Sequence, residues 1–168
     1  MVTLSDRLKA LGLQIGTSDL APRLARDAHP IESVVGGRLQ ETEFGDAFIV
    51  ERFIPAEEPY GGAPLRFPTA MEKLAAWGAD TRLALLSPER FVFLDTETTG
   101  VWGSGTMAFL VGVGRFQAGG FRQTQYFLRE PIEERAMLEA INRTIGSQDA
   151  LVTFNGKSFD LRLLKSRY

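Results

Sequence analysis

Two acidic residues, Asp95 and Glu97, stand at the end of the apolar run of residues 91–94. An apolar run of this length, bounded by turn residues, indicates a strand that is buried on both faces. Side chains at i and i+2 of a strand point to the same side, so these carboxylates would stand together where the strand leaves the sheet. Paired carboxylates repel each other unless a cation lies between them, and oxygen ligands favour magnesium or manganese. The pair therefore predicts a metal site; the alternative is a strand end whose acids face solvent or cap a turn.

The elements after this pair predict an α/β sheet. Residues 107–113 and 121–128 are also β-favouring and are separated by a glycine turn, which predicts a three-stranded meander with the first strand. A helix should follow over residues 131–145, because Pro131 suits the first helical position and one face carries an apolar stripe of Met137, Leu138, Ile141 and Ile145.

A third acid, Asp160, lies in the first turn of the last expected helix, after a short buried strand at 151–154. In the order β-β-β-α-β-α, the crossover should place this strand parallel to strand 91–95. Neighbouring parallel strands end at one edge of the sheet, where α/β folds bind ligands. We therefore expect Asp160 beside Asp95 and Glu97. Three such carboxylates suit two divalent ions that activate a water and stabilise the leaving oxygen in phosphodiester cleavage.

The composition limits the possible functions. The 168 residues are 44% hydrophobic and 24% charged, which is enough for one globular domain and an appendage. The absence of cysteine excludes disulfides, thiolate metal sites and cysteine nucleophiles. No apolar run reaches the roughly 18 residues of a membrane span, and the first ten residues lack a signal-peptide pattern. We expect a cytoplasmic protein without a membrane or disulfide partner.

The N-terminal half is less regular. We expect a small α+β extension and linker over residues 1–87, with a strand near 47–54, a Pro- and Gly-rich connection over 57–68 and a helix over 69–77. The single histidine, His29, precedes a proline and has no acidic or histidine neighbour, so we interpret it as a surface residue. The main domain is expected over residues 88–168.

The sequence around the acids resembles a known group of nucleases. The stretch Asp95-x-Glu97-Thr98-Thr99-Gly100 after an apolar strand resembles the first motif of the DEDD 3′→5′ exonucleases, which have a ribonuclease-H-like fold. Residues 153–160 resemble their second motif, which ends in a metal-ligating Asp. This second stretch, together with residues 109–114, is similar to the YprB-type ribonuclease-H-like proteins of bacteria. The resemblance covers residues 88–168 and implies an α/β, ribonuclease-H-like mixed sheet.

The resemblance also implies roles for individual residues. Asp95, Glu97 and Asp160 would be the catalytic ligands of Mg²⁺ or Mn²⁺, in a two-metal site when the fold is complete. Thr98 and Thr99 would contact the terminal nucleotide, although threonine after a strand is commonly turn chemistry.

Three further features have two interpretations each. Asn155 and Lys157 stand in the turn before Asp160 and could touch a phosphate. The alternative is that Asn155-Gly156 only makes a turn and that Lys157 is solvated. For Arg162, Lys165 and Arg167 we favour a solvated helix face over nucleic-acid contacts.

One part of the family pattern is not found in this sequence. DEDD enzymes carry a third motif, with a fourth acid and a His or Tyr, after a further strand and helix that this sequence does not contain. The resemblance therefore implies the N-terminal portion of a nuclease that acts on the 3′ end of single-stranded DNA or RNA and is impaired or inactive in this chain. The alternative is a catalytically inactive nucleic-acid-binding or regulatory module. DNA and RNA are not distinguished.

Overall fold

The structure is a computed structural model in which four segments are described, namely residues 30–66, 70–100, 105–146 and 150–168. His29, which we expect at the surface, and Thr69, the first residue of the helix expected over 69–77, lie outside the described residues. The chain divides into two units, residues 1–34 and 35–168. The first is described only for residues 30–34, which begin α2 (Ile31–Val35). The second unit contains the sheet and the site.

The strands of the second unit are β1 (Arg38–Thr42), β2 (Gly45–Pro55), β3 (Pro59–Tyr60), β4 (Ala63–Pro64), β5 (Phe91–Thr98), β6 (Ala108–Gln117), β7 (Gly120–Phe127) and β8 (Ala150–Val152). Its helices are α3 (Met71–Gly78), α4 (Glu134–Thr144) and α5 (Asp160–Arg167), with short 3₁₀ turns η1 (Thr81–Leu85), η2 (Pro88–Arg90) and η3 (Pro131–Glu133). Among the described residues, no helix is long and apolar enough to cross a membrane.

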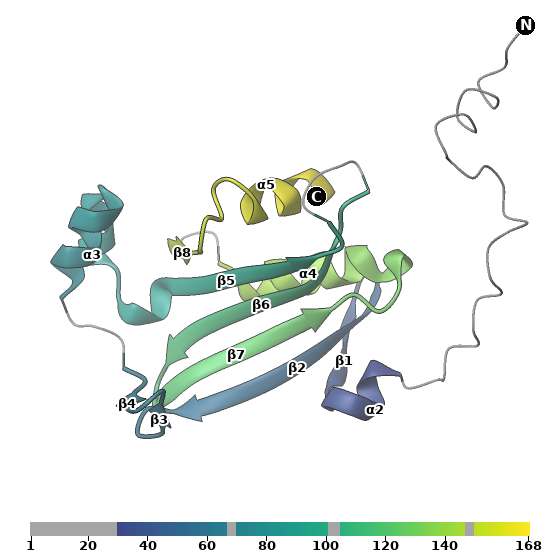
Figure 1. Cartoon of the computed structure of the whole chain (residues 1–168), viewed down its shortest axis with the longest axis horizontal. Helices are drawn as coiled ribbons and strands as arrows, with labels where there is room; N and C mark the ends of the chain where they lie inside the picture. The colour runs from purple at the N-terminus through teal and green to yellow at the C-terminus, as the bar shows by residue number, and fades with distance from the viewer. Residues whose placement is uncertain (1–29, 67–69, 101–104, 147–149) are drawn as a thin grey trace, which may run out of the picture. The chain divides into compact units, whose positions relative to one another are not determined.

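Six strands form one mixed sheet in the order β1-β2-β7-β6-β5-β8 (Figure 1). β5, β6 and β7 form the expected antiparallel meander, and β8 runs parallel to β5. The predicted α/β topology around β5 is confirmed. The sheet also includes β1 and β2, because β2 pairs antiparallel with β7. These two strands lie within residues 1–87, the segment expected to form an N-terminal extension.

The expectation of a buried strand over residues 151–154 is wrong. The strand ends at Val152, and Leu151 and Val152 are 40% and 38% exposed. β8 lies at the end of the sheet and pairs with β5, so one of its edges has no strand beside it in the described structure. Phe154, beyond the strand, is 92% exposed.

The core lies on the face of the sheet that α4 covers, as Figure 1 shows behind the strands. Alternate residues of β5, Val92 and Leu94, point into this core. The predicted apolar stripe of α4 packs there, with buried Met137, Leu138 and Ile141. Burial of these side chains is the main reason that α4 forms, because an isolated helix of this length is marginal in water.

Helix α5 is attached to the same face by contacts along its length. Leu164 enters the core, and the Tyr168 hydroxyl donates to the Leu138 carbonyl at 2.8 Å. The Arg167 guanidinium makes a two-pronged ion pair with Glu134 of α4, with nitrogen–oxygen distances of 2.6 and 2.5 Å. The expectation of a solvated helix face is therefore wrong for Arg167, while Arg162 and Lys165 are exposed as expected. These contacts fix the position of the first turn of α5, where Asp160 stands.

The opposite face of the sheet is only partly covered. Phe93 of β5 points there, together with Phe116 of β6 and Phe121 of β7. The three rings pack edge to face, with centroids 4.9 to 5.9 Å apart. All three remain partly exposed. We call this side of the sheet the open face.

Candidate functional site

Asp95 and Glu97 lie on the open face, at the end of β5. Successive side chains of β5 point to opposite faces of the sheet. Because Phe91 and Phe93 line a hollow on the open face, the next odd-numbered side chains, Asp95 and Glu97, point to that face as well. Both carboxylates are exposed. The register between β5 and β6 shifts directly after Glu97, which leaves Phe109 of β6 as an extra residue. Such bulges bend a strand and re-aim its side chains, and they are common beside active sites.

Asp160 lies beside the same stretch of β5, on the face of the sheet that α4 and α5 cover. It is 5% exposed and is the first residue of α5. One of its carboxylate oxygens accepts a hydrogen bond from the Thr96 hydroxyl. A carboxylate in the first turn of a helix also interacts favourably with the partial positive charge there. The third acid is thus tied to the residue between the two acids of the first motif.

The three carboxylates do not converge in this structure, contrary to the expectation from the strand order. Among the described residues, no group of three or more His, Cys, Asp or Glu side chains is placed to hold a metal ion. The reason is the alternation of β5, because Thr96 faces α5 while Asp95 and Glu97 face the other side. The oxygen donors suit a hard divalent ion in type, but their arrangement here does not form its complete site. Metal ligation by Asp95, Glu97 and Asp160 stays a prediction.

Thr98, the last residue of β5, and Thr99, just after it, both make hydrogen bonds with nearby backbone groups. The Thr98 hydroxyl donates to the Gly100 carbonyl at 2.8 Å. The Thr99 hydroxyl accepts from the backbone N–H of Met107 at 3.1 Å, and the Thr99 N–H donates to the Met107 carbonyl at 2.9 Å. These contacts support turn chemistry for both residues, which the sequence leaves as the alternative to nucleotide contact.

Asn155 and Gly156 form the turn that leads into α5. Asn155 has a φ of 58°, in the left-handed region that asparagine tolerates better than most residues. Its carbonyl accepts the N–H groups of Ser158 and Phe159 at 3.0 and 3.3 Å. At Gly156 a Cβ would lie 2.2 Å from the Thr153 hydroxyl oxygen, so this turn has no room for a side chain. Asn155 and Gly156 therefore form the turn. The side chain of Lys157 is exposed and accessible to a ligand.

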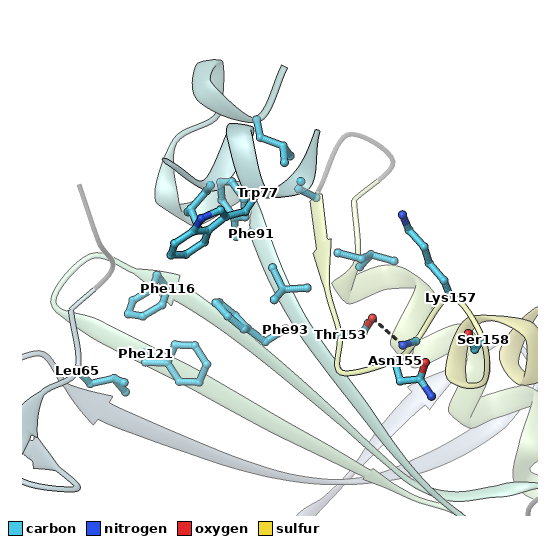
Figure 2. A pocket seen from close by; sticks show the side chains of 17 residues that line it. Leu65, Trp77, Phe91, Phe93, Phe116, Phe121, Thr153, Asn155, Lys157 and Ser158 are labelled. Atoms are coloured by element: carbon cyan, nitrogen blue, oxygen red, sulfur yellow. Dashed lines mark hydrogen bonds between the residues drawn. The ribbon is translucent and has the colours of Figure 1, made fainter. Parts of the chain in front are cut away.

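Two adjoining hollows lie on the open face. The larger, of about 1020 Å³, has the sheet rings of Phe93 and Phe121 on one side, Trp77 of α3 on another, and the turn with Asn155 and Lys157 on a third (Figure 2). The smaller, of about 660 Å³, is bordered by Asp95, Gly112, Gln123 and Phe154. Both share Phe93, Phe121, Val152 and Thr153. Of the predicted site residues, Asp95 borders the smaller hollow, and Asn155 and Lys157 border the larger one.

Sequence reasoning missed Thr96, Gly112, Gln123 and Phe154. The signal for Thr96 was present, because the residue between two acids of a strand must face the opposite side, where a covering helix would meet it. Gly112 and Gln123 come near Asp95 through the register of β5, β6 and β7, in which Gly112 pairs with Asp95 and Gln123 pairs with Gly114. Phe154 comes near them because β8 pairs with β5 and the chain turns just beyond it. No local pattern in the sequence reports such pairing.

Comparison with known proteins agrees with this architecture. Residues 92–168 match the RNase_H superfamily. Over 77 residues the chain is 36% identical to a protein of Bacillus subtilis (strain 168) described as uncharacterized protein YprB. This alignment covers 45% of the chain and 18% of the relative, so the chain matches less than a fifth of that protein's length. Together with the mixed six-stranded sheet, these matches support a YprB-type, ribonuclease-H-like fold for residues 92–168.

Proposed function

We propose that this chain carries the nucleic-acid site of a metal-dependent nuclease of the DEDD type, which hydrolyses phosphodiester bonds from the 3′ end. The superfamily match suggests a nuclease-like fold, and it begins at the strand that carries Asp95 and Glu97. The observation that carries the proposal is the hydrogen bond between Thr96 and Asp160. It brings the acid of the second motif to the same three-residue stretch of β5 as the two acids of the first.

The donor set supports a hard cation. Asp95 and Glu97 are exposed carboxylates two residues apart, and Asp160 keeps a second oxygen besides the one that Thr96 engages. A divalent ion held there would supply an activated water and offset charge at the scissile phosphate. The chain's own part is to hold the acids in place, through the bulge after Glu97 and the packing of α5. Lys157, exposed beside the turn, supplies a cation for a phosphate of the bound strand.

Thermal unfolding with metal tests the proposal on this chain. Wild type should gain stability with Mn²⁺ or Mg²⁺, by about 2.7 kcal/mol at a hundred times the dissociation constant. Asp95→Asn should abolish the gain. Asp46→Asn, which alters an exposed acid of β2 away from the site, should retain it. Equal gains in all three proteins, or none in wild type, would contradict the metal site.

Direction and substrate need a second assay. Single-stranded DNA and RNA labelled at the 3′ or the 5′ end should be incubated with Mn²⁺, with Mg²⁺ or with a chelator. Early release of a labelled 3′ mononucleotide, only with metal, is the expected result. Release of the 5′ label first would contradict the proposed polarity.

A second candidate is a nucleic-acid-binding module without turnover. The observation that favours it is that the three acids do not form a complete metal group within the described residues. It predicts binding of single strands in the chelator, equal binding by Asp95→Asn, and no cleavage with any metal. The proposed nuclease predicts cleavage that Asp95→Asn removes.

A further inference from the structure

At the base of the smaller hollow on the open face lies Gly112, which has no side chain. A Cβ built on Gly112 would meet nothing nearer than the Asp95 carbonyl oxygen, at 4.0 Å. The space above this glycine is therefore open, in the middle of the sheet and beside the first predicted metal ligand. Glycine inside a strand weakens it and often marks a place where a ligand or another backbone comes close. Because neighbouring backbone does not fill this space, a flat ligand can come close to the strand at Gly112.

Aromatic side chains form the walls of this hollow. Phe93 and Phe121 stand at one side, with ring centroids 5.8 Å apart and planes at 65°. Phe154 borders the hollow from the turn after β8 and is 92% exposed. A side chain this exposed contributes little to folding, because it removes almost no apolar area from water. Its ring is available to stack on a flat partner.

The hollow also has a polar side chain that can form hydrogen bonds with the edge of a base. Gln123 lines the hollow and is half-buried, and its amide offers both donors and an acceptor. No hydrogen bond of this amide occurs within the part of the chain that the structure describes. The adjoining larger hollow carries Lys157, which adds a positive charge for a backbone phosphate (Figure 2).

We propose that the smaller hollow receives one nucleobase of a single-stranded nucleic acid, lying over Gly112, stacked on Phe154 and hydrogen-bonded by Gln123. The proposal rests on the proposed function, because it takes the bound polymer to be nucleic acid. It goes further by assigning a base-binding site on the open face of the sheet. Stacking on an aromatic side chain accepts any base, whereas the Gln123 amide can discriminate between base edges.

The test compares a base-bearing strand with one that lacks bases. Fluorescence anisotropy should be measured with labelled oligothymidylate and with an abasic deoxyribose-phosphate strand of equal length, both in chelator to prevent cleavage. Gly112→Val fills the hollow with a strand-favouring side chain at ordinary contact distance, and the backbone there is not left-handed. Phe154→Ala removes the stacking ring from an exposed position, where folding does not depend on it. Gln40→Val, which places the same valine side chain in β1, away from the hollow, is the control.

Wild type and Gln40→Val should bind oligothymidylate more tightly than the abasic strand. Gly112→Val and Phe154→Ala should lose this preference, with roughly five- to 150-fold weaker binding of oligothymidylate and unchanged binding of the abasic strand. If wild type shows the preference and both variants keep it, the base site is wrong while the proposed function stands. If wild type binds neither strand, both proposals are overturned.

Discussion

The contact between Thr96 and Asp160 should stabilise the fold measurably. Replacing Thr96 by valine keeps the branched shape, which suits a strand, and removes the hydroxyl that donates to the buried carboxylate. Asp160 is 5% exposed, so water cannot readily replace the lost donor. The substitution therefore leaves a buried carboxylate oxygen without its hydrogen-bond donor, which lowers the free energy of unfolding.

The magnitude follows from the type of bond. A hydrogen bond to a charged group contributes about 1.5–3 kcal/mol. Thermal midpoints of domains near this size fall by about 2–4 °C per kcal/mol, so Thr96→Val should lower the midpoint by roughly 3–12 °C. Thr96→Ser keeps the hydroxyl and should lose much less.

The assay is thermal and urea unfolding at neutral pH, with a control for the chemical change itself. Thr124 of β7 is also buried, at 5% exposure, and its hydroxyl makes no side-chain hydrogen bond within the described structure. Thr124→Val should be neutral or stabilising. If Thr96→Val is as stable as wild type, or if both valine variants behave alike, the hydrogen bond does not hold Asp160 against β5.

Two further predictions concern the turn and the core. Gly156→Ala should cost about 1–3 kcal/mol in urea unfolding, because its Cβ would lie 2.2 Å from the Thr153 hydroxyl oxygen and 2.5 Å from the Thr153 Cβ; an unchanged midpoint would show that the turn has room. Burial raises the pKa of Tyr126, whose hydroxyl pairs with Thr144 at 2.5 Å. The folded state then holds the phenolic proton more tightly than the unfolded state, so this stability is complete below pH 10 and is lost as pH rises through the folded-state pKa. Tyr126→Phe should show a smaller loss of stability between pH 9 and 11 than wild type, whereas parallel pH profiles would contradict the assignment.

The elements from β5 onward were predictable because their signals are local. The apolar run at 91–94, the glycine turn between β6 and β7 and the stripe of α4 each report one element by periodicity or turn chemistry. The parallel direction of β8 and β5 followed from the helical crossover, α4, that connects β7 to β8. The order of the elements predicted Asp160 near β5, but not that it meets the strand on the face opposite Asp95 and Glu97.

The remaining features depend on long-range contacts. Pairing of β2 with β7 joins residues such as Ile49 and Tyr126, which no local pattern connects. The ion pair of Arg167 with Glu134 depends on how α5 docks on α4. The three acids lie on two faces of the sheet because side chains alternate along β5. Thr96 points to α5 and contacts Asp160, whereas Asp95 and Glu97 point to the opposite face.

The most direct measurement of the proposed metal centre is paramagnetic broadening by Mn²⁺ in a two-dimensional amide NMR spectrum. At substoichiometric Mn²⁺, the signals of Asp95, Glu97 and Asp160 and their neighbours should broaden first and together. Asp95→Asn should remove the effect at all three positions. Broadening near Asp95 and Glu97 that leaves Asp160 sharp, or equal broadening over the whole protein surface, would contradict a shared metal site.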